Sequence, residues 1–165
     1  MKKYSKFLSL FFVAALTVCT FFWLQPSDSK YIKKRIYQAC STVGKSADEN
    51  PAVAAFKMFD FASLCANSVT FAIEGAPFQG AMSNEVFISE LTRYRALCQK
   101  IVIEPLDLEV DIVAPNNATA KCVVKAQIKG NSFDFEEIRH FQIKFIKTDN
   151  AWKFLALDDD GVLKR

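Results

Sequence analysis

Residues 101–157 alternate apolar and polar side chains through four strand-length segments, which turn residues separate. Because a period of two places every second side chain on the same face of a strand, this pattern predicts an antiparallel meander with one apolar face. The block before it is rich in phenylalanine and has apolar residues at helical spacing. This order of elements predicts an α+β fold, with a curved antiparallel sheet packed on N-terminal helices.

Two helices are predicted in the phenylalanine-rich block. Asn50 is a suitable N-cap and Pro51 suits the first helical position, so a helix is expected from residue 51 to about residue 66. Its buried face is assigned to Val53, Phe56, Phe59, Leu64 and Cys65. A short strand over 69–74 and a Gly/Pro break come before the second helix, over about 84–98. That helix is expected to bury Phe87, Ile88, Leu91, Tyr94 and Cys98.

The turns of the meander fix a strand register. A first turn centred on Asn116 would place Leu108 opposite Val124 on the inner face. The same register pairs Val110 with Cys122, Asp107 with Lys125 and Asp111 with Lys121. Pro105 predicts an edge or a bulge near the start of the first strand. The second turn is expected at 130–132, and the third at 149–150, which pairs Phe145 with Phe154, Ile143 with Ala156 and Lys147 with Trp152.

The first 29 residues are predicted to be a membrane anchor and linker, with one domain over 30–165. Residues 7–24 form a run of 18 residues without a charge, close to the roughly 20 needed to cross a bilayer. A single-pass signal anchor in the inner or plasma membrane is favoured, with secretion after cleavage as the alternative. The short basic tail favours an extracytoplasmic, periplasmic domain. Residues 30–43 are either the first helix of the domain or an amphipathic helix resting on anionic headgroups.

The charge of the chain argues against a nucleic-acid partner. Lys2, Lys3 and Lys6 account for the whole formal excess of +3, and residues 46–165 hold more acidic than basic side chains. Proteins that bind nucleic acids normally carry a basic stripe with stacking groups, and none is visible in this sequence.

The final hairpin carries a family resemblance. In KTDNAWKFLALDDDGVL a polar turn precedes Trp152 and Phe154, much like the dG-x-W-x-I ending of the nuclear transport factor 2-like superfamily. With the order of the predicted elements, residues 30–163 resemble this superfamily, including its SnoaL-like branch. The resemblance implies a cone-shaped α+β barrel, a homodimer through the sheet and a cavity for a small apolar ligand. The superfamily includes isomerases, hydrolases, scaffolds and assembly subunits, so the fold leaves the activity open.

The cavity is expected to be lined by Phe87, Leu91, Tyr94, Arg95, Phe145 and Trp152. Asp107, Glu109 and Asp111 are out of phase with the apolar residues of their strand, which leaves Glu74, Tyr94 and Arg95 as candidate polar groups of the cavity. His140 is the only histidine, and its position predicts the outer face. The sequence therefore predicts no catalytic residue, no cofactor and no metal site. The cysteines lack C-x-x-C spacing and fall on apolar faces, so Cys40, Cys65, Cys98 and Cys122 are expected to be buried free thiols.

These patterns favour a membrane-anchored, non-catalytic module that binds a ligand or a protein. The first alternative is a small-molecule isomerase or hydrolase that uses the barrel cavity. The second is a subunit of a membrane-associated assembly such as a secretion system.

Overall fold

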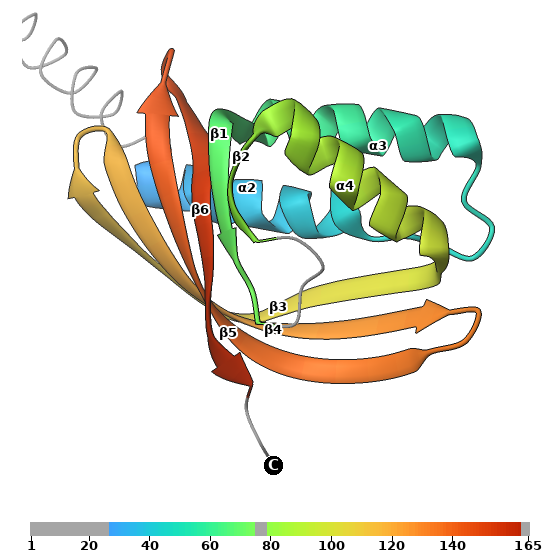
Figure 1. Ribbon diagram of the computed structural model, residues 1–165. Helices are drawn as coiled ribbons and strands as arrows, with labels where there is room; N and C mark the ends of the chain where they lie inside the picture. The colour runs from blue at the N-terminus through green and yellow to red at the C-terminus, as the bar shows by residue number, and fades with distance from the viewer. Residues whose placement is uncertain (1–26, 75–78, 163–165) are drawn as a thin grey trace, which may run out of the picture.

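The computed structural model describes residues 27–74 and 79–162, in which helices pack against one face of a strongly curved sheet (Figure 1). This arrangement confirms the α+β class and the helices-then-meander order predicted from the sequence. In chain order the elements are α2 (Asp28–Val43), α3 (Pro51–Leu64), β1 (Cys65–Ala72), β2 (Gly80–Ser83), α4 (Asn84–Leu97), β3 (Cys98–Ala114), β4 (Asn117–Gly130), β5 (Asp134–Thr148) and β6 (Ala151–Val162).

The sheet of the described residues is mixed, with the strand order β2-β1-β6-β5-β4-β3. β3 to β6 form the predicted antiparallel meander, but β1 pairs with β6 in parallel. The prediction of a purely antiparallel sheet was therefore wrong. Parallel neighbours need a long connection, and α4 with the first three strands of the meander supplies it. A connection of that length leaves no local signal of pairing in the sequence.

α2 is the first helix of the domain. It begins at Asp28, two residues before the predicted domain boundary, and the Ser27 side chain caps it. Ile32 and Ile36 are buried in the core, so the apolar stripe of α2 contacts the domain, in agreement with the first of the two interpretations. The predicted anchor at 7–24 lies outside the described residues. Among the helices that are described, none is long and apolar enough to cross a membrane.

α3 starts at Pro51 with Asn50 as its N-cap, as predicted, but its buried face was assigned wrongly in part. Phe56 and Phe59 are 65% and 73% exposed, and Val53 is also exposed. The face that contacts the core consists of Met58, Phe61 and Leu64. Apolar residues occur all round this helix, so their spacing alone could not identify the buried side.

In the first hairpin the predicted residues face inward, but the two strands pair in a different register. Leu108 pairs with Cys122, and Glu109 with Lys121, a shift of two residues from the expected pairing. Because the side-chain period is two, this shift leaves the apolar residues on the inner face. A bulge between Pro105 and Asp107 on the edge strand β3 confirms the role predicted for Pro105.

The last hairpin has the predicted turn. Asp149 and Asn150 both adopt positive φ angles, 51° and 60°, as a two-residue hairpin turn requires. The pairs Phe145–Phe154 and Lys147–Trp152 are confirmed. A bulge between Lys144 and Phe145 then pairs Ile143 with Leu157 in place of the expected Ala156.

Candidate ligand-binding cavity

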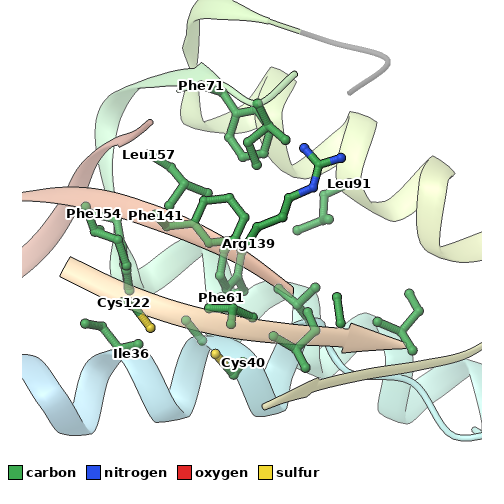
Figure 2. A pocket seen from close by; sticks show the side chains of 18 of the residues that line it. Ile36, Cys40, Phe61, Phe71, Leu91, Cys122, Arg139, Phe141, Phe154 and Leu157 are labelled. Atoms are coloured by element: carbon green, nitrogen blue, oxygen red, sulfur yellow. The ribbon is translucent and has the colours of Figure 1, made fainter. Parts of the chain in front are cut away.

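The helices and the inner face of the sheet enclose a cavity of about 350 Å³. Such a volume lies at the lower end of the range of roughly 300–1,000 Å³ that is usual for small-molecule sites. Figure 2 shows Cys40 and Cys122 at the floor and the guanidinium of Arg139 pointing away from them. The cavity therefore has a closed apolar floor and a more polar end.

Most of the cavity wall is apolar because β3, β4 and β5 each contribute only every second side chain, from the face that points inward. β4 contributes Cys122, Val124, Ala126 and Ile128, while β5 contributes Phe135, Phe141 and Ile143. α2 closes the floor with Ile36, Ala39, Cys40 and Val43. The aromatic rings of Phe61, Phe71, Phe87 and Phe154 line the remaining wall. These rings border the cavity without filling it.

The polar end is built around Arg139 of β5. Its Nε donates to Glu137 Oε2 at 2.7 Å, and its Nη1 donates to Asp159 Oδ2 at 2.6 Å. Nη1 also donates to the main-chain oxygen of Glu74 at 2.9 Å. Hydrogen bonds to Glu137 and Asp159 keep the pKa of Arg139 above its ordinary value, so this guanidinium stays charged. The Glu137 side chain is 36% exposed, which identifies this end as the mouth of the cavity.

Tyr94 of α4 lies at the same end of the cavity. Burial raises the pKa of its hydroxyl, and the nearby Cys98 and Glu137 raise it further. Tyr94 is therefore protonated at neutral pH and is able to donate a hydrogen bond to a polar group in the mouth.

Of the six residues predicted to line the cavity, the structure brings Phe87, Leu91 and Tyr94 together there. Arg95 lies elsewhere because it forms a buried ion pair behind the wall. Its Nη2 donates to Glu49 Oε2 at 2.8 Å and to the Gly44 oxygen at 2.9 Å, and its side chain is 4% exposed. Lys57 also binds Glu49, so the group holds the loop between α2 and α3 against α4.

Phe145 and Trp152 are also outside the cavity lining. Both are fully buried in the core cluster that holds the first turns of α2 against the sheet. Phe145 packs against Phe154, with ring centroids 4.6 Å apart and ring planes tilted by 45°. Both residues are on the inner face of the sheet, as predicted. They lie near the β5–β6 turn, however, where α2 covers the sheet closely. Phase predicts the face of a strand but not the position of a cavity along it.

Glu137 and Arg139 line the cavity but were not among the residues predicted from the sequence. A signal for them was present, since both are odd-numbered residues of β5, in phase with Phe135, Phe141 and Ile143. Alternation along the strand places them on the inner face, although charged side chains are usually solvated. Glu74 does line the cavity, as the sequence analysis suggested.

Cys40, Cys65 and Cys122 line the cavity as thiols, and Cys98 lies nearby in the core. All four are free, and all but the half-buried Cys40 are fully buried, which confirms the prediction of free thiols on apolar faces. Burial raises the pKa of Cys40 and of Cys65 to about 12, and that of Cys122 to about 11. These thiols are therefore neutral wall groups at physiological pH.

Comparison with known proteins identifies the fold. No family model matches the chain, and no curated protein matches it. A type 2 hexachlorocyclohexane dehydrochlorinase has a TM-score of 0.64 at 12% identity, covering 81% of this chain and 84% of that chain. A candidate scytalone dehydratase from Novosphingobium aromaticivorans has a TM-score of 0.63 at 15% identity, covering 82% and 83%.

A nuclear transport factor 2-like protein with a cystatin-like fold, also from Novosphingobium aromaticivorans, has a TM-score of 0.61 at 15% identity, covering 93% of this chain and 88% of that chain. At such identities the similarity shows the fold alone. The chain therefore has the nuclear transport factor 2-like fold, as its resemblance implied. Membership of the SnoaL-like branch stays a prediction.

Proposed function

We propose that this domain binds one small, largely apolar molecule in its cavity and releases it unchanged. The observation that carries this proposal is a cavity of about 350 Å³ whose wall is apolar except at one end. Apolar ligand surface buried there contributes about 2.5 kcal/mol per 100 Å². After the cost of association, a ligand of about ten carbon atoms is expected to bind with a Kd on the order of micromolar.

Non-catalytic binding is favoured over catalysis because of the residues at the mouth. Among the described residues that line the cavity there is no histidine, and His140 has the opposite phase on β5. The carboxylate of Glu137 is held by Arg139 at 2.7 Å. A general base needs a lone pair directed at the reacting proton, and the hydrogen bond from Arg139 already occupies a lone pair of Glu137 Oε2.

A fluorescent apolar probe, N-phenyl-1-naphthylamine, tests the proposal. Titration of the native protein should give saturable binding with one site per domain. Ala126→Trp fills the cavity from β4 and should abolish this binding, while Ala96→Trp on the exposed face of α4 should leave it unchanged. Ile128→Trp provides a second cavity variant if Ala126→Trp does not fold by circular dichroism. Equal binding by a folded cavity variant and the control would overturn the proposal.

A proton-transfer enzyme, such as an isomerase or dehydratase, is the second candidate. One observation favours it, namely that Tyr94 and Glu137 lie close enough at the mouth for the charge of Glu137 to raise the pKa of Tyr94. Some solved structures with this fold also carry the names of dehydratases or dehydrochlorinases. Turnover of small carbonyl or halogenated substrates that is lost in Tyr94→Phe and in Glu137→Gln, but not in Glu109→Gln, would establish this candidate in place of simple binding.

The domain is proposed to act at a membrane surface. The support is the uncharged run at 7–24 in the sequence, which ends three residues before Ser27, the N-cap of α2. An extracytoplasmic domain should be digested by protease added to intact spheroplasts, and protection there would place it in the cytoplasm instead. Recovery of the intact chain in the soluble fraction would argue against the anchor.

A further inference from the structure

We infer that the ligand of this cavity carries a protonated amine, and that the mouth discriminates against carboxylates. This inference rests on the proposed binding function and adds the chemical class of the ligand. It follows from the ionisable side chains of the described cavity lining, of which Glu74 and Glu137 are acidic and Arg139 is basic.

The ionisable side chains that line the cavity, besides tyrosine and cysteine, are Glu74, Glu137 and Arg139. Asp159 lies directly behind them, with a side chain that is 1% exposed and bound to Arg139. The carboxylates of Glu137 and Asp159 therefore both bind this guanidinium, and the exposed side chain of Glu74 also borders the cavity. The positive charge of Arg139 is already directed at Glu137 and Asp159, through contacts of 2.7 Å and 2.6 Å.

A ligand carboxylate would add a fourth negative charge to this group. An ammonium group would instead bring the charges closer to balance and find acceptors in the partly exposed carboxylates of Glu137 and Glu74. The low dielectric constant of an apolar cavity strengthens this difference. Tyr94, with its raised pKa, stays neutral and adds no charge.

Three basic side chains of the described residues, Lys45, Lys57 and Arg95, are engaged away from the cavity. Lys45 donates to the main-chain oxygens of Arg95 and Cys98, and Lys57 and Arg95 bind Glu49. None of these residues lines the cavity. They lie on or against the α2–α3 loop, where their donors are directed at the main chain and at Glu49.

Three ligands with the same ten-carbon chain test the inference, namely decylamine, 1-decanol and decanoate. Each is titrated at pH 7.5 and low salt against bound N-phenyl-1-naphthylamine, below its aggregation concentration. Decylamine should displace the probe at a concentration at least tenfold lower than decanoate, with 1-decanol between them. The difference should shrink in 0.5 M NaCl because the mouth is partly open to solvent. Decanoate binding as tightly as decylamine, or more tightly, would overturn the inference.

Variants separate the role of the mouth from adhesion to the surface. Glu74→Gln and Glu137→Gln should each reduce the preference for decylamine several-fold, whereas Glu109→Gln, on the exposed face of β3, should leave it unchanged. The Glu74 side chain is exposed, so Glu74→Gln should fold even if Glu137→Gln does not. Ala126→Trp should not bind the probe, so none of the three ligands should change the probe fluorescence in its presence. If none of them displaces the probe from the native protein, the proposed function fails; if all bind without a preference for the amine, only this inference fails.

Discussion

The indole Nε1 of Trp152 donates a hydrogen bond to Asp28 Oδ1 at 2.9 Å. Trp152 is the second residue of β6 and Asp28 is the first residue of α2, so this bond joins the starts of the first described helix and the last strand. Lys147 Nζ contacts the same carboxylate at 3.1 Å and lies 5.4 Å from the centre of the Trp152 ring. Asp28 also sits in the first turn of α2, where a negative charge is favourable.

Asp28→Ala is therefore expected to destabilise the protein more than loss of an exposed acid would suggest. The Trp152 side chain is 1% exposed, and an unpaired buried donor costs about 1–3 kcal/mol. Urea denaturation should show a loss of that size. Asp28→Asn keeps an acceptor oxygen and should lose less, while Asp48→Ala, at an exposed loop position, should change the free energy of unfolding by about 0.5 kcal/mol or less. Equal losses for Asp28→Ala and Asp48→Ala would contradict the structure.

The buried pair of Glu49 and Arg95 is expected to be the most sensitive ionic contact of the described residues. Their side chains are 2% and 4% exposed, so Arg95→Met leaves a buried carboxylate with Lys57 as its remaining partner. Removal of one partner of a buried pair typically costs about 3–5 kcal/mol. The matched control is Arg93→Met, which breaks the exposed pair with Glu90 and should cost about 1 kcal/mol or less. Thermal or urea unfolding would measure both, and a similar loss in the two variants would refute the ranking.

Much of this architecture was predictable because it depends on local patterns. The period of two, the turn at Asp149-Asn150 and the N-cap at Asn50 fix the meander and the start of α3. The parallel pairing of β1 with β6 was not predictable, because residues far apart in the chain form it. Which side of α3 is exposed was also not predictable, because Phe56, Phe59 and Phe61 give the helix apolar residues on several sides.

The cavity was only partly predictable, for a related reason. Alternation along β5 determines which side chains face inward, and it places Glu137 and Arg139 on the same face as Phe141 and Ile143. Whether an inward residue borders open space depends on how closely a helix covers it. Phe145 and Trp152 lie under the first turns of α2 and are packed, whereas Phe141 is farther along β5 and borders the cavity.

The stability of the protein should fall on acidification, in part through Glu49. Burial opposes its ionisation, but the hydrogen bond from Lys57 and the charge of Arg95 outweigh this and hold its pKa below the ordinary value of 4.5. A carboxylate whose pKa is lowered by folding contributes stability that is complete above about pH 4.5. Below that pH the unfolded chain takes up the proton first, so the contribution is lost as the pH falls toward the pKa in the folded state. Urea titrations of the wild type and of Glu49→Gln should differ most at pH 7 and converge toward pH 3; a constant difference would exclude this origin.

The cavity thiols should react very slowly in the folded protein. Burial raises the pKa of Cys40 from 9.0 to about 12, which lowers its thiolate fraction at pH 8 about a thousandfold. Because the thiolate is the reacting species and α2 covers the floor, iodoacetamide should label Cys40, Cys65 and Cys122 at far lower rates in the native protein than in urea. Peptide mapping by mass spectrometry distinguishes the sites, with the unfolded protein as the control. Rapid labelling of Cys40 in the folded protein would show that the floor of the cavity opens to solvent, in conflict with the packing of α2 on the sheet.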